Sequence, residues 1–309
     1  MPISRREFMA SAVVMGVAAC SVAPTSVEAR TLWGSEGLHD GHFLRPRAID
    51  ICNDEVFVID TTGRVQVFAK DGTFARMWKI PKQDNGTPTA VIHTPDNQHI
   101  ILPDTHNSRI LIYTPEGELV DQWGEYGTGT DQFIYPTGIT RSAEGIFFIS
   151  EYGVGADRVH VFDGAHQYLR DWKSMGESNG EFGRAMDIAM SRDGQVLVAD
   201  TVHHRIQIFE QDGTFVSTFG GPGKEPGLLD FPYDIAVTPE NTVLIAEYGN
   251  HRISHMTLDG TFLGAIGRAG RGSGEFNAPR GLCLNDSGDV YVADTDNHRV
   301  QHFRMEDFT

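Results

Sequence analysis

The sequence predicts an all-β protein, a six-bladed β-propeller whose ring is closed by an N-terminal strand that completes the last blade. Two ladders of side chains support this prediction. An acidic residue recurs every 44 to 49 residues, at Asp60, Asp104, Glu151, Asp200, Glu247 and Asp294. An arginine follows each one at a similar spacing, at Arg64, Arg109, Arg158, Arg205, Arg252 and Arg299. A repeat of this length is typical of a propeller blade.

The fourth repeat shows what one blade contains. Strand patterns cover residues 186–190, 195–199, 205–209 and 215–219, with turn residues such as Asp212-Gly213 between them. Four short strands joined by hairpin turns are the content of a propeller blade.

The last repeat lacks a fourth strand, because the chain ends soon after residues 299–303. The segment Thr31-Leu32-Trp33-Gly34 matches the fourth-strand endings of other repeats, such as Gln122-Trp123-Gly124 and Thr218-Phe219-Gly220. We expect this segment to complete the sixth blade, which removes the open sheet edge and ties the two chain ends together.

Composition and charge exclude some partners. The 309 residues are 40% hydrophobic, and glycine and proline are spread along the chain instead of gathered into one linker, as in an ordinary globular protein. Together with the repeats, this favours a single propeller domain over 30–309. The formal net charge is −17. Nucleic-acid binding needs a basic stripe, so we expect no nucleic-acid partner and no docking on anionic lipid.

Residues 1–29 have the features of an export signal. Arg5 and Arg6 precede an apolar run over 10–19 that is too short to span a bilayer, which resembles a twin-arginine signal peptide. Residues 17–20 resemble a lipoprotein box that would leave Cys20 lipidated, whereas residues 27–29 resemble an ordinary cleavage site. We expect an exported protein, periplasmic or extracellular. Both cleavage alternatives stay open, and only the lipoprotein box would give a membrane contact, through a lipid on Cys20. Cys52 and Cys283 are then left as buried thiols.

Residues 294–303 read Asp-Thr-Asp-Asn-His-Arg-Val-Gln-His-Phe, with Gly-Glu-Phe-Asn-Ala-Pro-Arg-Gly upstream at 274–281. Residues 247–253 repeat the pattern as Glu-Tyr-Gly-Asn-His-Arg-Ile. This signature resembles the consensus of NHL repeats, and the similarity runs from about residue 31 to 303. The resemblance implies a protein-binding platform, an RNA-binding module, or a lyase similar to the peptidyl-hydroxyglycine amidating lyases.

The resemblance to the lyases implies zinc-binding histidines where each inner strand begins. Here those positions carry Thr89, Thr137, Tyr233 and Arg280, so the family's zinc mechanism is not expected. His106 and His203 are the weak metal candidates, with zinc or calcium as an alternative to the expected absence of a cofactor. No nucleophile motif is present, and no catalytic residue is predicted.

Repeated residues first suggest a structural role. Acid and arginine at the same place in all six repeats fit buried ion pairs within the blades. His204, His251 and His298 belong to the same signature, and we expect them to stabilise the repeats as well.

One position where the repeats disagree points to a binding site. Arg47 and Arg280 occupy equivalent positions in blades 1 and 6, which become neighbours when the ring closes. Two adjacent guanidinium groups need an anion between them. Either a protein carboxylate such as Asp50 supplies it, or a ligand does.

In the ligand alternative, Tyr233 forms an aromatic wall of the site, and Asp187 and Asp234 accept hydrogen bonds. Tyr152 and Tyr248 replace the threonine of the repeat signature, for which recognition and repacking remain equal alternatives.

The predicted function is that of a binding or scaffold module, a monomer whose channel face recognises a protein, peptide or small anionic ligand. The alternative is a metal-dependent lyase or hydrolase with a divergent site at the channel mouth.

Overall fold

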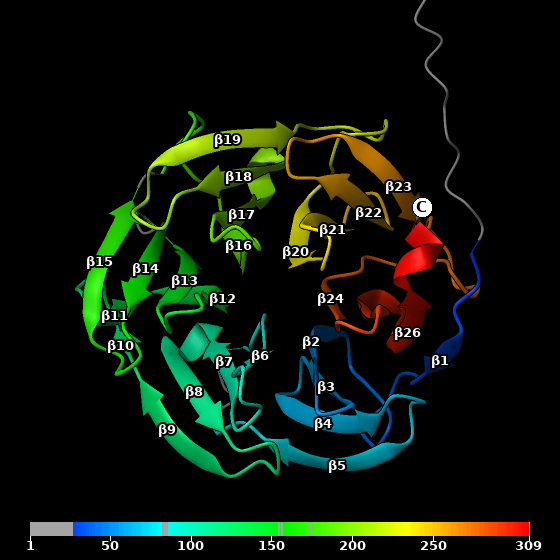
Figure 1. Cartoon of the computed structure of the whole chain (residues 1–309). Helices are drawn as coiled ribbons and strands as arrows, with labels where there is room; N and C mark the ends of the chain where they lie inside the picture. The colour runs from blue at the N-terminus through cyan, green and yellow to red at the C-terminus, as the bar shows by residue number, and fades with distance from the viewer. Residues whose placement is uncertain (1–26, 82–85, 154, 156, 174, 309) are drawn as a thin grey trace, which may run out of the picture.

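The computed structural model of the chain describes residues 27–308, apart from 82–85, 154, 156 and 174. Six antiparallel four-stranded sheets surround a central axis, so the predicted propeller is confirmed (Figure 1). Residues 1–26 of the predicted export signal (1–29), including Cys20 of the predicted lipoprotein box, lie outside the described residues. No helix in the described part of the chain is long and apolar enough to cross a membrane.

In the first three blades, the strands run from the axis outward in chain order. Blade 1 contains β2 (Pro46–Cys52), β3 (Glu55–Asp60), β4 (Arg64–Ala69) and β5 (Phe74–Lys79). Blade 2 contains β6 (Ile92–His93), β7 (Ile100–Asp104), β8 (Arg109–Tyr113) and β9 (Leu119–Trp123). Blade 3 contains β12 (Tyr135–Arg141), β13 (Phe147–Tyr152), β14 (Arg158–Phe162) and β15 (Tyr168–Lys173).

Blades 4 and 5 keep this order. Blade 4 contains β16 (Ala185–Met190), β17 (Val196–Asp200), β18 (Arg205–Phe209) and β19 (Phe215–Gly220), close to the predicted bounds. Blade 5 contains β20 (Pro232–Val237), β21 (Thr242–Glu247), β22 (Arg252–Thr257) and β23 (Phe262–Ile266). Blade 6 contains β24 (Gly281–Leu284), β25 (Asp289–Asp294), β26 (Arg299–Arg304) and, as its outer strand, β1 (Thr31–Trp33).

The chain ends meet in blade 6, as predicted from the missing fourth strand. Strand β1 pairs with β26 in antiparallel register, with Leu32 opposite Gln301. Next to this pairing, the Arg30 guanidinium lies 2.7 Å from a Glu306 carboxylate oxygen and 2.9 Å from one of Asp307. The N-terminal segment is therefore held to the last turn of the chain, η4 (Met305–Phe308), by charge as well as by the sheet.

Short parallel pairings lie within the connections between neighbouring blades. Strands β10 (Glu125–Tyr126) and β11 (Gln132–Phe133) pair in the loop between blades 2 and 3. Four other connections contain an equivalent bridge ending at Phe43, Phe182, Leu229 or Phe276. The side chain at this point is fully buried in each case, so it anchors the connection between two blades.

The hydrophobic core lies between blades. The second and third strands are buried along almost their whole length, as in β3 and β4, whereas the outer strand β5 is partly exposed. Each middle strand is covered on both faces by the adjacent blades, which explains its continuous apolar sequence. One cluster combines Phe148 and Val159 of blade 3 with Ile188 and Val198 of blade 4.

The acid and arginine ladders form ion pairs in all six blades. The pairs measure 2.5 Å for Asp60–Arg64, 2.9 Å for Asp104–Arg109, 2.7 Å for Asp200–Arg205, 2.6 Å for Glu247–Arg252 and 2.7 Å for Asp294–Arg299, and Glu151 pairs with Arg158. Every acid in the ladder is fully buried. The arginines also donate to backbone carbonyls of the connection entering the blade, as Arg299 does to Gly272 and Glu275. The ladders therefore fasten connections to blades.

The histidines of the repeat signature join consecutive blades. The Nδ1 atoms of His204, His251 and His298 accept hydrogen bonds from the backbone N–H groups of Phe231, Ala278 and Arg45, at 3.1, 3.0 and 3.2 Å. In each case the histidine belongs to one blade and the N–H group belongs to the next blade. These histidines therefore have a structural role, because they connect consecutive blades.

Candidate functional site

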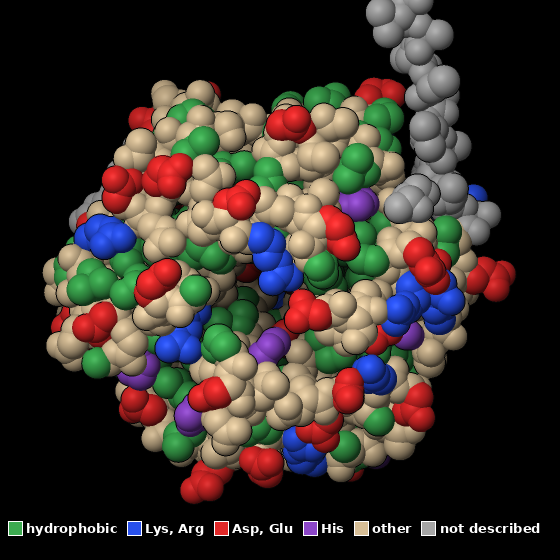
Figure 2. All heavy atoms as spheres, viewed as in Figure 1, with side chains coloured by type: hydrophobic (Ala, Val, Ile, Leu, Met, Phe, Trp, Pro, Cys, Tyr) green, Lys and Arg blue, Asp and Glu red, His purple; other side chains and the backbone are tan. Residues whose placement is uncertain are grey.

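The six inner strands enclose a cavity of about 190 Å³ on the propeller axis, which all six blades line. The face of the disc that carries η4 is hollowed at its centre, with Lys or Arg, Asp or Glu, and His side chains around the hollow (Figure 2). The inner strands end on this face and begin on the opposite one. We call the end of the cavity where the inner strands begin the channel mouth. The residues at or just before the starts of these strands include Arg47, Arg184, Tyr233 and Arg280.

Arg280 lies against two aromatic rings of blade 5 at the channel mouth. Its guanidinium carbon is 4.8 Å from the ring centre of Tyr233 and 4.8 Å from that of Tyr248. The two rings contact each other, with centres 5.3 Å apart. A cation over an aromatic face is attracted by the ring but keeps its charge. The tyrosines therefore position Arg280 without neutralising it.

Arg47 lies close to Arg280, and their positive charges repel. Burial, together with the positive charges of Arg280 and Arg45, lowers the pKa of Arg47 to about 10. The Nε–H groups of Arg47 and Arg280 are both buried and have no hydrogen-bond acceptor in the described part of the chain. A buried donor without a partner is costly, so this pair has unused capacity to bind an anion.

The protein carboxylate that we considered for this pair binds elsewhere. Asp50 contacts Nδ1 of His93 at 2.8 Å. No described carboxylate lies within ion-pair distance of Arg47 or Arg280 (residues 27–308, without the gaps given above). Arg45 does have a partner, Asp296, at 2.9 Å. The alternative in which Asp50 neutralises the arginine pair is therefore wrong.

A second group of cationic and aromatic side chains lies on the blade 3 side of the mouth. The Arg184 guanidinium carbon is 4.7 Å from the ring centre of Tyr152. Tyr152 contacts Tyr135, with ring centres 5.2 Å apart, and Tyr135 contacts His106 at 5.3 Å. Tyr152 and Tyr248 thus have the same role, because each supports an arginine from the next blade.

His106 connects the two groups electrostatically. Burial and the charges of Arg47 and Arg184 lower the pKa of His106, against the opposing effect of Asp104. Its Nδ1 atom is buried and has no partner among the described residues. The imidazole is therefore neutral at pH 7. Its pKa depends on the charges of both Arg47 and Arg184.

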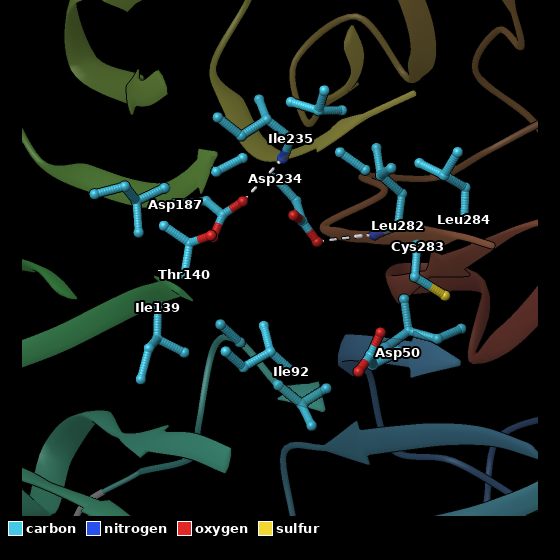
Figure 3. A pocket seen from close by; sticks show the side chains of 17 residues that line it. Asp50, Ile92, Ile139, Thr140, Asp187, Asp234, Ile235, Leu282, Cys283 and Leu284 are labelled. Carbon is cyan, nitrogen blue, oxygen red and sulfur yellow. Dashed lines mark hydrogen bonds between the residues drawn. The ribbon is translucent and has the colours of Figure 1, made fainter. Parts of the chain in front are cut away.

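Asp187 and Asp234 lie deeper in the cavity than we expected from sequence (Figure 3). Asp187 accepts a hydrogen bond from the backbone N–H of Ile235 at 3.0 Å, and Asp234 accepts one from Leu282 at 2.8 Å. Each carboxylate thus joins its blade to the next one. The structure does not bring them to the arginines at the mouth, so their expected role as acceptors beside Tyr233 has no support in the geometry.

The two carboxyl groups interact, because each changes the pKa of the other. Burial raises the pKa of Asp187 to about 6, and burial with the charge of Asp187 raises the pKa of Asp234 well above its usual value. Gly138 occupies the equivalent position in blade 3, where an added Cβ would lie 2.6 Å from the Asp187 carboxylate. A small residue beside the pair is therefore necessary.

The two metal candidates do not meet. His203 contacts the ladder carboxylate Asp200 at 3.0 Å, whereas His106 packs on Tyr135. The described residues contain no group of three His, Cys, Asp or Glu side chains arranged to hold a metal ion. The fold therefore places His106 and His203 in different contacts and does not bring them together as ligands of one metal ion.

Sequence reasoning missed Arg184 and Tyr135 as members of the mouth. Both lie directly before or at the start of an inner strand, two positions before the residues that we compared between repeats. No repeat signal marks them, because this position differs between repeats, with Arg45, Phe231 and Ala278 in blades 1, 5 and 6. Of the predicted residues, Arg47, Tyr152, Tyr233, Tyr248 and Arg280 do lie at the mouth.

This fold and these side chains define a six-bladed β-propeller whose channel opens between tyrosines and arginines that have no acidic partner in the described part of the chain. Residues 182–209 and 276–303 match the NHL repeat family. The chain is therefore a six-bladed propeller in which these two segments match NHL repeats.

Among curated proteins, Protein brain tumor of Drosophila melanogaster is 27% identical over 123 residues. The match covers 39% of this chain and 11% of that protein, so this chain matches only about a tenth of that relative's length.

Solved propellers share the fold at low sequence identity. A structural genomics protein of unknown function from Bacteroides thetaiotaomicron superposes with a TM-score of 0.71 at 14% identity, covering 90% of this chain and 75% of that one. Streptogramin B lyase gives 0.61 at 13% identity, covering 87% and 95%. Hydrazine synthase of Kuenenia stuttgartiensis gives 0.60 at 13%, covering 87% and 98%. At these identities the similarity shows the fold alone.

Proposed function

We propose that this protein is a binding module whose channel mouth recognises the carboxylate group of a small ligand, peptide or protein through Arg47 and Arg280. NHL repeats and the propeller fold are consistent with a scaffold that presents one binding face. The similarity to streptogramin B lyase extends to the fold alone, so the proposal rests on the side chains at the mouth.

One observation carries the proposal. All six ladder arginines have a buried acid, and Arg45 has Asp296, whereas Arg47 and Arg280 have no acid among the described residues. The positive charge of Arg280 helps to lower the pKa of Arg47, in a chain with a net charge of −17. In an acidic protein, two neighbouring arginines without acids are consistent with a site for an external anion.

The energetics favour a carboxylate between these groups. A planar guanidinium presents a pair of donors that match the two oxygens of a carboxylate. A bound carboxylate would also relieve the repulsion between Arg47 and Arg280 and satisfy the buried Nε–H groups. Hydrogen bonds to charged groups contribute about 1.5–3 kcal/mol each, enough for measurable affinity from one site.

Calorimetric titration with butyrate and with glutarate tests this function. We expect the parent protein to bind at least one of them, and the Arg47→Ala/Arg280→Ala variant to lose at least about tenfold in affinity. Arg192→Ala is the matched control, because Arg192 lies in the turn after β16, at the other end of the inner strand. Equal affinity of the parent and the double variant would contradict the proposed site. Thermal melts of each variant check that the fold is retained.

A further inference from the structure

We infer that the ligand carries two carboxylate groups and that the second one binds at Arg184 and His106, across the mouth from Arg47 and Arg280. This inference rests on the proposed function, since it assigns the first carboxylate to the arginine pair. It adds a second half to the site and a chemical class to the ligand.

The arginine and tyrosine arrangement occurs twice at the mouth. In one half, Arg280 lies over Tyr233 and Tyr248, which contact each other. In the other half, Arg184 lies over Tyr152, which contacts Tyr135. In both halves the aromatic residues belong to one blade and the arginine to the next. An arginine stacked on a tyrosine of the preceding blade is therefore found on two sides of the channel.

The order of blades separates the two halves. Arg280 and Arg47 belong to the connected blades 6 and 1, whereas Arg184 precedes β16 of blade 4. Blades 1 and 4 are three places apart in a ring of six, so they lie on opposite sides of the axis (Figure 1). A ligand that reaches both halves must span the mouth.

Arg184 has charge available for a ligand. Asp157 is the nearest acid that contacts this residue, but its carboxylate accepts from the Arg184 backbone N–H at 2.8 Å. The guanidinium group itself is directed over Tyr152 and has no acid within ion-pair distance in the described part of the chain. Its side chain is exposed, so a ligand can approach it.

His106 supplies a second donor on the same side of the mouth, because its ring contacts Tyr135, and Tyr135 contacts the Tyr152 ring under Arg184. Its pKa is lowered by burial and by the charges of both Arg47 and Arg184, which places the ring within the field of each half. An anion bound beside it would offset those charges and favour the protonated ring, a donor at both nitrogens. The buried Nδ1 without a partner is consistent with a group that becomes fully satisfied when an anion binds.

The separation of charge favours two carboxylates over one phosphate. A single tetrahedral anion concentrates its charge at one point, whereas the mouth places cations in two opposite groups. Two anionic groups on one linker bind with a gain in effective concentration, provided that the linker matches the span. The class that fits is a short dicarboxylate or a chain end that bears two carboxylates.

The test titrates dicarboxylates from malonate to adipate against butyrate, with inorganic phosphate as a further probe. It compares the full parent protein, Arg184→Ala, Arg47→Ala/Arg280→Ala and the control Arg192→Ala. We expect one chain length to bind at least about tenfold more tightly than butyrate. Arg184→Ala should remove this advantage while leaving the affinity for butyrate unchanged. The double variant should lose both ligands.

The outcomes separate the two proposals. If butyrate binds through Arg47 and Arg280 but no dicarboxylate binds more tightly, the function stands and the inference is wrong. The inference also fails if Arg184→Ala weakens butyrate and dicarboxylates equally, or if phosphate binds best and needs all three arginines. If no probe distinguishes the parent from the double variant, the proposed function itself fails.

Discussion

The guanidinium carbon of Arg280 lies 4.8 Å from the ring centre of Tyr248, a residue that replaces the threonine found at this position in blades 1, 2, 4 and 6. The departure from the repeat thus coincides with the support of an unpaired cation. Tyr152 repeats the relationship with Arg184 in blade 3. Both tyrosines position charge at the channel mouth.

The ring of Tyr248, and not its hydroxyl, should matter for binding. Tyr248→Ala removes the surface that holds Arg280, and we expect glutarate affinity to fall by about 0.5–2 kcal/mol. Tyr248→Phe keeps the ring and should bind like the parent in calorimetry. An equal loss in both variants would show that the hydroxyl contacts the ligand directly.

Glutarate affinity should increase as the pH falls through the region below pH 6.5. The pKa of His106 in the free protein is lowered by burial, Arg47 and Arg184, and a bound anion raises it. Binding then takes up a proton between the two pKa values, so acid favours the complex. Titration in two buffers of different ionisation enthalpy measures the uptake. A His106→Gln variant that keeps the same uptake would assign the proton elsewhere.

The Asp187–Asp234 pair should make the protein less stable as the pH rises. Both groups have raised pKa values in the folded state, so the folded chain binds more protons than the unfolded chain above about pH 4. Stability attributable to the pair is then complete below pH 4 and decreases through pH 6 and above. Asp234→Asn keeps the shape of the side chain and removes one titrating carboxyl. Chemical unfolding from pH 4 to 8 should show a flatter profile for this variant than for the parent. Identical profiles would contradict the raised pKa values of this pair.

Breaking one pair of the charge ladder should destabilise the propeller strongly. Asp294 is fully buried and accepts from Arg299 at 2.7 Å, so Asp294→Ala leaves a nearly buried arginine without its acid. The expected cost is about 3–5 kcal/mol, measured by denaturant unfolding. Arg192→Ala removes the exposed Arg192–Asp286 contact of 3.5 Å and a hydrogen bond of 3.2 Å to the Thr238 carbonyl, and should cost less than about 1.5 kcal/mol. Similar losses for the two variants would contradict a structural role for the ladder.

The closing strand can be tested with two adjacent residues. Trp33 is 9% exposed and its ring centre lies 5.9 Å from those of Phe68 and Tyr291, so Trp33→Ala should cost about 3–5 kcal/mol. Leu32 is 41% exposed, and Leu32→Ala should change stability by less than about 0.5 kcal/mol. Deletion of residues 30–35 should unfold the protein or cause aggregation. A thermal melt unchanged by the deletion would refute closure by β1.

The fold was accessible from sequence because its determinants repeat. Six copies of the acid and arginine spacing give the blade number, and the unmatched segment at Thr31 explains the incomplete last blade. Strand bounds in blade 4 were predicted to within one residue, since its turns carry clear glycine signals.

The site was only partly accessible because its residues come from different repeats and depend on side-chain direction. Sequence comparison placed Arg47 and Arg280 in neighbouring blades, but it could not show that the Asp50 carboxylate contacts His93. Asp234 directly follows Tyr233, yet its carboxylate bonds to the next blade deep in the cavity. Arg184 carries no repeat signal, and only the stacking on Tyr152 reveals it.

A crystal structure of the protein with bound glutarate tests the central claim most directly. The account predicts electron density for a carboxylate between Arg47 and Arg280, within hydrogen-bond distance of both guanidinium groups, and a second carboxylate beside Arg184. A mouth that stays empty at saturating glutarate, or glutarate bound away from both arginines, would contradict the account.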